Sequence, residues 1–501
     1  MSLKNIVQAS INDHLDNDIG FEIDVPKYDH GDYALNLAFK LAKQKKKSPK
    51  IIAEEITTQL NKNNELFRAS SNGGFVNIRI EDAELFNYFV TFLNESPKLI
   101  SKKNVILEYV SANPTGPLHI GHGRWAAIGD SLYRLLKSVN INVKNEFYIN
   151  DAGNQIHVFN ESIKAKINGT PIPENGYGGH YIEKIINQNK SGTNVDFVID
   201  DQRQTLKKMN CTFDQWFKES SIQKSTILEI INKNYQEHVY KKDHAIWFRT
   251  TTFGDDKDRV IMKENGDLTY FAADIAYHLN KIDRGFNQIV NIWGADHHGY
   301  VKRIEACIKA KTNNVDLTVI LGQLVHLYKN GEPVKMSKRT GELIELDEVI
   351  DEIGSDAARY FLLEKKPDIH LEFDLSIATK KNMDNPVYYI QYAHARICNI
   401  INKISDQKEN NSLELNDMDR QLMLIGSRYY DVLYEAAKTY EPYKLAQYLY
   451  NLAKLFHSFY QKNHVIYDEH IHIKRLDIIK NIKKIIVHGF EILGISTPEK
   501  M

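Results

Sequence analysis

Cysteine is scarce in this sequence, and the few cysteines lie far apart along the chain. Only Cys211, Cys307 and Cys398 occur in 501 residues, with no C-x-x-C pair among them. An odd and widely spaced set argues against a disulfide framework and against a thiolate zinc site. It is typical of a protein that works in a reducing compartment, and we expect a cytoplasmic location.

Long apolar runs and an excess of one charge are also missing. No apolar stretch is long enough to span a bilayer, and the first residues lack the basic-then-apolar order of a signal peptide. The chain has 64 Lys and Arg against 65 Asp and Glu, a formal net charge of −1. The composition as a whole therefore indicates neither a membrane protein nor a nucleic-acid binder, although local clusters can still bind polyanions.

The length and the hydrophobic pattern predict several soluble domains of an α/β multidomain protein. Residues 1–98 have the pattern of a small α+β extension. Residues 99–380 alternate apolar strands with amphipathic helices, which predicts a Rossmann-like, doubly wound sheet. Residues 381–501 show only helical spacing, as in Leu445, Leu449, Leu452, Phe456 and Phe459, and predict an all-α helical bundle.

Two segments rich in lysine need separate interpretation. A lysine cluster near the N-terminus is either a solvated loop or a contact for a phosphate backbone. It comprises Lys43, Lys45, Lys46, Lys47 and Lys50. The lysine- and asparagine-rich segment from about 160 to 245 has mainly helical patterning and is interpreted as an insertion into the sheet domain.

The stretch "SANPTGPLHIGHGR", residues 111–124, lies between a buried strand and an amphipathic helix. Doubly wound folds bind ligands at this edge of the sheet. Gly121 and Gly123 would let the backbone approach a ligand, while His119 and His122 could donate hydrogen bonds to phosphate. A zinc site that includes His297 and His298, or a plain structural turn, are the alternatives, and the context favours phosphate binding.

A second motif, "GEPVKMSKRTGE" at residues 331–342, carries Lys335, Lys338 and Arg339 between glycines. A short basic loop can close over a polyphosphate and neutralise charge in the transition state. Taken alone, the motif fits an exposed charged hairpin equally well. Its occurrence with the histidine motif favours phosphate chemistry.

Carboxylates and amides form a third set near the predicted strand ends. Glu108 interrupts an otherwise apolar strand, and a buried carboxylate is costly without a cationic partner. Either a structural partner such as Arg124 or a cationic substrate would meet that need. The other members of the set are Asn113, Asp151, Asn154, Asp274 and Asp296.

These motifs resemble those of a known family. "PLHIGH" and "KMSKR" resemble the HIGH and KMSKS signatures of class I aminoacyl-tRNA synthetases. In order along the chain, "EYVSANPTGPLHIGHGR", "YINDAGNQ", "GDLTYFAADIAYHL", "GADHHGY" and "LGISTPEKM" are similar to the bacterial type of the arginyl-tRNA synthetase family. A lysine at the position of Lys338 is absent from many members, and the family's anticodon-domain signature is degraded here to "EPYKLAQYLY".

The resemblance implies a reaction and its partners. Arginine and ATP would form arginyl-adenylate and pyrophosphate, and the arginine would then pass to tRNA-Arg. Residues 1–98 would be the tRNA-binding extension, 99–380 the catalytic domain and 381–501 the anticodon-binding domain. Magnesium is expected with ATP, with no metal held by the protein itself, and the family implies a monomer.

The resemblance also assigns roles to residues. ATP binding and catalysis would involve His119, His122 and Lys338, with Gly121 leaving room for the nucleotide. Gly294, Asp296 and Lys335 complete the expected ATP-binding set. Arginine binding is assigned to Glu108, Ser111, Asn113, Tyr270 and Asp274. Two carboxylates and a tyrosine hydroxyl suit the planar fork of guanidinium donors.

Three other functions would also account for parts of this pattern. A small-molecule nucleotidyltransferase with a HIGH motif would be much shorter and would not need the helical bundle. A synthetase-derived RNA-binding or regulatory protein would have lost residues of the two signatures, which are present here. A synthetase for another amino acid is the nearest alternative, and Glu108 with Asp274 argues for a cationic substrate.

Overall fold

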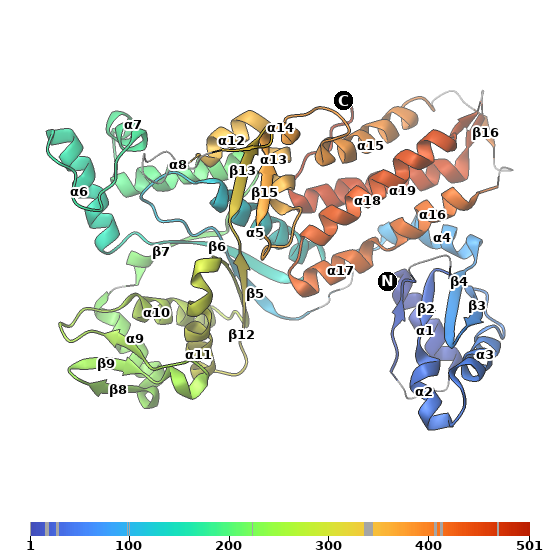
Figure 1. The fold of residues 1–501 in the computed structure, drawn as a ribbon, viewed down its shortest axis with the longest axis horizontal. Coiled ribbons are helices and arrows are strands. Elements are labelled where there is room, and N and C mark those ends of the chain that lie inside the picture. Colours follow the sequence, from blue (N-terminus) through green and yellow to red (C-terminus); the bar gives the residue numbers. More distant parts are fainter. Residues whose placement is uncertain are drawn as a thin grey trace.

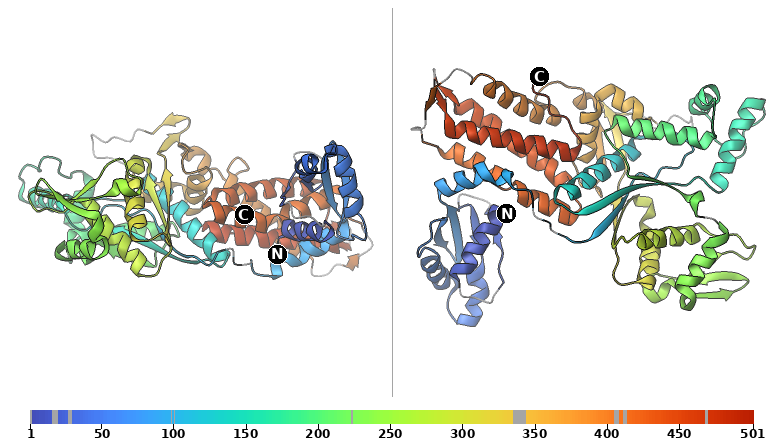
Figure 2. Two further views of the ribbon diagram at one scale, coloured as in Figure 1. Left: turned by 90° about the horizontal axis from the view of Figure 1, so that it is seen from below. Right: turned by 180° about the vertical axis from the view of Figure 1, so that it is seen from behind.

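The structure is a computed structural model that describes residues 2–15, 20–26, 30–97, 99, 101–222, 224–334, 344–404, 408–410, 414–467 and 470–501. The molecule is elongated, with the N-terminal unit at one end, the C-terminal helices in the middle and the sheet domain at the other end (Figures 1 and 2). Within the described ranges no helix is long and apolar enough to cross a membrane.

The N-terminal unit is a four-stranded antiparallel sheet with helices, as predicted for an α+β extension. The strand order is β1-β2-β4-β3. Its elements are α1 (Leu3–His14), β1 (Ile23–Asp24), β2 (Tyr33–Leu35), α2 (Leu37–Lys45), α3 (Pro49–Leu60), β3 (Phe67–Asn72), β4 (Phe75–Ile80) and α4 (Asp82–Thr91). Helix α4 packs on the C-terminal helices α16 and α19, so it joins the unit to the bundle (Figure 1).

The central sheet has five parallel strands in the order β12-β11-β5-β6-β7. The strands are β5 (Asn104–Glu108), β6 (Asn142–Ile149), β7 (Gln215–Lys218), β11 (Gln288–Gly294) and β12 (Asp316–Gly322). The two faces of β5 bury alternate residues. Val105 and Leu107 lie in one core with α5 (Ile120–Ser138), whereas Ile106 lies in a second core with α10 (Tyr270–Asp283) and α11 (Val301–Lys311). Helices thus cover both faces, and the doubly wound prediction is confirmed.

The segments between and after these strands form smaller layers. The insertion contains α6 (Asn154–Asn168), α7 (His180–Gln188), α8 (Asn194–Lys208), α9 (Lys224–Tyr235), β8 (Val239–Lys242), β9 (Ala245–Phe248) and β10 (Arg259–Met262). Beyond β12 come β13 (Val325–Lys329), β14 (Glu332–Pro333), α12 (Leu346–Ile353), α13 (Ser355–Leu363), β15 (Leu371–Asp374) and α14 (Leu375–Ala378). The mainly helical pattern of residues 160–245 did not predict β7, which adds an edge strand to the central sheet, or β8, which pairs with β9 in a separate small sheet.

The C-terminal region is a bundle of long helices, as predicted, with one addition. Its helices are α15 (Pro386–Ile401), α16 (Asp417–Ser427), α17 (Tyr429–Thr439), α18 (Tyr443–Lys462) and α19 (Ile473–Leu493). The five spaced apolar residues of α18 are all fully buried. A small sheet, not expected from the helical spacing, contains β16 (Lys408–Asn410), β17 (Ile466–Tyr467) and β18 (His470–His472).

One buried guanidinium joins three parts of the fold. Arg359 on α13 has no exposed surface, and its Nη2 lies 2.7 Å from Asp130 Oδ2 on α5. It also donates to the backbone oxygens of Met209, just after α8, and Leu493, the last residue of α19, both at 2.7 Å. The sheet domain, the insertion and the bundle therefore meet at this side chain.

Candidate functional site

The predicted site residues gather at the carboxyl ends of the central strands. Glu108 is the last residue of β5, and its Cα partners on the neighbouring strands are Asn291 on β11 and Glu146 on β6. In the alternation of β5, Glu108 falls on the same face as Ile106, the face covered by α10. This is the edge at which doubly wound folds bind ligands.

The two histidines form a compact turn at the start of α5. His119 is the N-cap residue, and its Nδ1 accepts a hydrogen bond from the Gly121 N–H at 3.1 Å. The His122 Nδ1 in turn accepts from the His119 N–H at 3.3 Å, and the two rings stack with centroids 3.8 Å apart. Because each Nδ1 is an acceptor, the hydrogen of each neutral ring lies on Nε2.

Burial keeps both rings neutral at physiological pH. It lowers the pKa of the His119 imidazole, and it lowers the pKa of His122 to about 3, with a further contribution from the neighbouring His119. The turn therefore offers neutral Nε2–H donors at the positive end of the helix dipole, rather than two positive charges. Such donors can stabilise charge that develops on a phosphate.

The two glycines of this turn serve different purposes. A Cβ at Gly121 would lie 2.9 Å from the His119 ring, so glycine there leaves room for the histidine cap. A Cβ at Gly123 would lie 2.6 Å from a methyl group of Leu346 on α12. The expectation that Gly123 lets the backbone approach a ligand is therefore wrong, because this glycine lets α5 and α12 pack closely.

Glu108 is buried and has a cationic partner that the sequence analysis did not identify. Its Oε2 lies 2.5 Å from the Nζ of Lys281 on α10. Arg124, the partner considered from the sequence, instead donates to the backbone oxygens of Gln323 and Lys366 at 2.8 and 3.0 Å. The Arg124 alternative is wrong because α5 directs that side chain away from the strand end.

Ser111 links Glu108 to the next strand. Its hydroxyl donates to Glu108 Oε1 at 3.1 Å and accepts from the Tyr148 N–H of β6 at 3.1 Å. The backbone of Ser111 has a φ of +42°, in the left-handed region that serine rarely adopts. These contacts fix the turn that leads from β5 towards the histidines.

Asp274 lies on α10, four residues after Tyr270 and therefore on the same side of the helix. Tyr300, which follows the "GADHH" stretch, donates its hydroxyl hydrogen to Asp274 Oδ2. Burial raises the pKa of Asp274 to about 7; the Tyr300 hydrogen bond and the Lys281 charge oppose this shift, and Glu108 and Glu219 add to it. Asp274 therefore titrates near neutrality, which is typical of a group that exchanges a proton for a ligand.

An open pocket lies beside Asp274. Tyr270 is 64% exposed and lines this pocket, whose volume is about 1080 Å³, together with Phe271, Tyr300, Glu219 and Arg303. Tyr300, Glu219 and Lys281 were not among the predicted site residues. Lys281 lies seven positions after Asp274, which is two helical turns and thus the same side of α10. This spacing was the one sequence signal that could have identified it.

The remaining predicted residues lie around the same edge. Asn113 is exposed, and its backbone oxygen accepts from Gln202 at 3.1 Å. Gly294 ends β11, and Asp296 lies in the following turn with its side chain 83% exposed. Asp151, after β6, binds the backbone and hydroxyl of Ser220 at 2.9 and 2.6 Å.

Part of the predicted site lies outside the described residues. Lys335, Lys338 and Arg339 fall within 335–343, which the structure does not describe. Among the residues it does describe, no group of three or more His, Cys, Asp or Glu side chains is arranged to hold a metal ion. The zinc alternative for the histidine motif therefore has no support from these residues.

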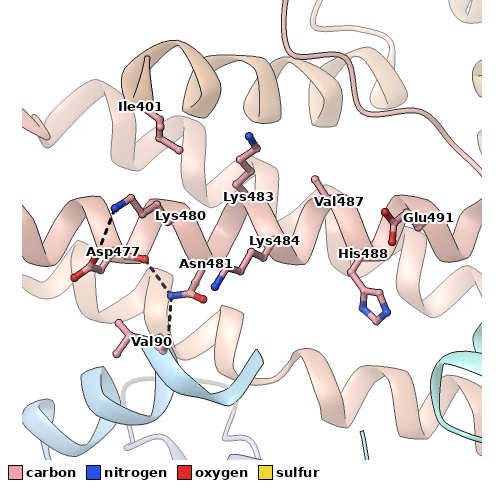
Figure 3. Close-up of a pocket in the computed structure, with 10 residues that line it drawn as sticks. All are labelled: Val90, Ile401, Asp477, Lys480, Asn481, Lys483, Lys484, Val487, His488 and Glu491. Atoms are coloured by element: carbon pink, nitrogen blue, oxygen red, sulfur yellow. Dashed lines mark hydrogen bonds and ion pairs between the residues drawn. The ribbon is translucent and has the colours of Figure 1, made fainter. Parts of the chain in front are cut away.

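A second groove, of about 650 Å³, lies far from this edge, between α4, α15 and α19 (Figure 3). Its wall on α19 carries Lys480, Lys483, Lys484 and His488. Asn481 donates to the backbone oxygens of Asp477 and Val90 at 3.1 and 3.5 Å, which fastens α4 to the bundle. Of the predicted catalytic residues that the structure describes, neither His119 nor His122 lines this groove.

Three family models match the chain in succession. The model described as the arginyl tRNA synthetase N terminal domain matches residues 1–80. The class I (R) tRNA synthetase catalytic domain matches residues 87–174 and 175–403, and the DALR anticodon binding domain matches 390–501. Together these matches account for nearly the entire chain.

Curated proteins and solved structures agree with these models. An arginine–tRNA ligase of Listeria welshimeri is 38% identical over 96% of this chain and 94% of its own length. One from Desulfitobacterium hafniense is 38% identical over 99% and 98%. The Thermus thermophilus arginyl-tRNA synthetase matches with a TM-score of 0.83 at 20% identity over all of both chains. The Plasmodium falciparum enzyme matches with 0.74 at 19% identity, over 100% of this chain and 98% of its own.

Proposed function

Because the chain belongs to the arginyl-tRNA synthetase family, we propose that Glu108 and Asp274 bind the guanidinium of arginine and that the turn at His119 and His122 binds the phosphates of ATP. The chain is a class I arginine–tRNA ligase. It activates arginine with ATP to arginyl-adenylate and pyrophosphate, and transfers the arginine to tRNA-Arg.

The observation that carries the proposal is a pair of carboxylates at one edge of the sheet, Glu108, which is buried, and Asp274, which is half-buried. Glu108 ends β5, and Asp274 lies on the helix that covers the same face. A guanidinium has five donors in a fixed plane, and carboxylate oxygens accept them two at a time. Tyr270 completes the proposed guanidinium site, while Ser111 and Asn113 would contact the amino and carboxylate groups of arginine.

The chemistry requires no nucleophile from the protein. The carboxylate of arginine attacks the α-phosphate of ATP, and pyrophosphate leaves. The residues of this chain then act by orienting the two substrates and by stabilising developing charge. On the proposed assignment, His119, Gly121 and His122 lie along the phosphates, and Gly294 and Asp296 lie near the adenosine.

The lysines of the 331–342 loop complete the proposed ATP site. Lys335 and Lys338 would bind the phosphates, and Lys338 would stabilise the pyrophosphate as it leaves. Magnesium would arrive with ATP and be held mainly by phosphate oxygens, as is usual for this ion. We further propose that the protein acts as a cytoplasmic monomer; its three buried, unpaired cysteines suit a reducing compartment.

The pH dependence of arginine binding tests the Asp274 assignment. Arginine pairs with the ionised carboxylate, and a carboxyl with a pKa of about 7 must lose its proton before it can do so. The affinity should therefore rise about tenfold per pH unit below pH 7 and become constant above it. Calorimetric titration with arginine between pH 5.5 and 8.5 measures this. An affinity independent of pH would contradict the assignment.

Lys338→Ala should slow adenylate formation by about a hundredfold, since one group of this kind contributes roughly 3 kcal/mol to transition-state stabilisation. Arginine binding should change little, because the charge acts on the pyrophosphate. A single-turnover activation experiment separates the two effects. Lys329→Ala is the control, because Lys329 pairs with Glu352 on the surface at 2.7 Å and should have no role in catalysis. Equal activation rates for Lys338→Ala and the parent would remove Lys338 from the mechanism.

A further inference from the structure

A buried lysine lies directly behind the proposed arginine site. Lys281 on α10 has no exposed surface. Its Nζ lies 2.5 Å from Glu108 Oε2 and 3.1 Å from Asn291 Oδ1, and it sits 4.4 Å from the centre of the Tyr277 ring. Burying an ammonium group is costly, so a lysine in this position is tolerated only because these partners compensate its charge.

The same helix supplies a second cation to the neighbouring strand. Glu146, the partner of Glu108 on β6, is fully buried. Its Oε2 lies 2.6 Å from Arg284 Nη1, and its Oε1 accepts from the Tyr277 hydroxyl at 2.6 Å. Lys281 and Arg284 are three residues apart on α10, so the helix places one positive charge opposite each of two adjacent strand carboxylates.

The two ion pairs differ in what lies next to them. Arg284 and Glu146 form a cluster with Tyr277 and Gln215, which donate or accept hydrogen bonds within it. Glu108, by contrast, also binds Ser111 and lies close enough to Asp274 to raise the pKa of that carboxyl. Only the Lys281 pair therefore belongs to the wall of the proposed arginine site.

The charges of that wall match a single guanidinium. Two carboxylates, Glu108 and Asp274, and one ammonium, Lys281, leave one net negative charge; in the adjoining pocket Glu219, which also raises the pKa of Asp274, is balanced in charge by Arg303. Without Lys281 the site would hold two neighbouring carboxylates with no fixed cation between them, and two such groups do not both ionise near neutrality. Each oxygen of a carboxylate can accept more than one hydrogen bond, so Glu108 can bind Lys281 and a guanidinium together.

We propose that Lys281 is a positioning residue for arginine recognition: it holds the Glu108 carboxylate in place at the end of β5 and cancels its charge, so that one guanidinium neutralises the site. This inference rests on the proposed assignment of Glu108 and Asp274 to arginine. Lys281 itself touches no substrate and acts through Glu108.

The titratable and polar groups around Glu108 come from every element packed on it, and each of them can affect the pH dependence of arginine binding. They are Lys281, Asp274 and Tyr277 from α10, Ser111 from its own turn, Tyr148 and Glu146 from β6, and Asn291 from β11. His278, which contacts Asn291 at 3.2 Å, stays neutral because burial lowers its pKa to about 3. The only fixed positive charge against Glu108 among these groups is that of Lys281.

Replacing Lys281 by methionine should change how arginine binding depends on pH. Without the ammonium, Glu108 and Asp274 share a proton that arginine must displace, and the pH above which affinity becomes constant should rise by about one unit or more. At pH 7 the variant should bind arginine at least about tenfold more weakly than the parent, and at pH 9 the difference should shrink. Calorimetric titration of the full chain with arginine from pH 5.5 to 9 measures both quantities.

Arg284→Met is the matched control, because it breaks the neighbouring ion pair at the end of the same helix without touching Glu108; Glu146 is as buried as Glu108, whereas the Arg284 side chain is 25% exposed. It should lower thermal stability but leave the pH profile of arginine binding as in the parent. Lys281→Arg keeps the charge and should keep the parent's plateau pH. If circular dichroism shows that Lys281→Met is unfolded, Lys281→Gln takes its place, since glutamine can still donate to Glu108 without a charge.

The outcomes separate this inference from the assignment on which it rests. A Lys281→Met (or Lys281→Gln) variant with the parent's plateau pH, while Asp274→Asn abolishes the pH dependence, would overturn the role of Lys281 alone. A parent protein that binds arginine without pH dependence, or an Asp274→Asn variant that binds like the parent, would contradict the arginine site itself.

Discussion

Asp274→Asn should lower kcat/KM for arginine by a factor of a hundred or more. The change keeps the shape of the side chain and removes its charge, so the guanidinium would be buried with one carboxylate partner fewer. Loss of one partner from a buried ion pair typically costs about 3–5 kcal/mol. The measurement is steady-state charging of tRNA-Arg by the parent and the variant over a range of arginine concentrations.

Two analogues of arginine, one uncharged and one with a compact ammonium group, provide a more specific test of the assignment. Citrulline, which is nearly isosteric with arginine but uncharged, should be disfavoured less by the variant than by the parent. Lysine should remain a poor substrate of both, because its compact ammonium leaves acceptors of the site unpaired. Asp283→Asn removes the same charge from an exposed position on the same helix and should behave like the parent. Equal use of arginine by the parent and Asp274→Asn would show that Asp274 does not contact the guanidinium.

Arg359→Leu should cause the largest loss of stability among the substitutions considered. The guanidinium is fully buried, pairs with Asp130 and donates to the carbonyls of Met209 and Leu493. Leucine fills part of the space but leaves these acceptors without a donor, at a cost of about 3–5 kcal/mol in the free energy of unfolding. Urea denaturation followed by circular dichroism measures the loss.

Arg134→Leu is the control for that substitution. Arg134 binds the same carboxylate, with its Nε 2.7 Å from Asp130 Oδ2, but its side chain is 30% exposed. Asp130 would retain Arg359, so the cost should be about 1 kcal/mol or less. Should the two variants unfold at the same urea concentration, the buried contacts of Arg359 to the insertion and the bundle would contribute nothing to stability.

Most of the fold could be predicted because its hydrophobic pattern is local. The apolar run of β5 and the regular spacing along α5 and α18 each arise within one element. The hydrophobic pattern did not predict the secondary structure where the strands are short or where a helical stretch is interrupted. Residues 33–60, which have a mainly helical pattern, form β2, α2 and α3; Lys46 has a φ of +50° after α2, and Ser48 caps α3. Strand β7 has four residues, too few to show a period.

The site was predictable in part, for a related reason. A carboxylate inside an apolar strand requires compensation, and this singled out Glu108. Its partner Lys281 is 173 residues away along the chain, and only the packing of α10 on the sheet brings the two together. Tyr300 was missed in the same way, because its contact with Asp274 depends on how the turn after β11 meets α10. The 331–342 loop was singled out by its motif, but the lysines that would act there lie outside the described residues.

Helix α5 connects the histidine turn of the sheet domain to the C-terminal bundle. Its first turn is the histidine cap, and eleven residues on from His119 the side chain of Asp130 is fastened through Arg359 to the end of α19. A helix of 19 residues is about 28 Å long and resists bending. A displacement of α19 must therefore either break the Arg359 contacts or carry α5 with it. As long as the Arg359 contacts hold, a shift of the bundle would therefore also move the turn at which the nucleotide phosphates are proposed to bind.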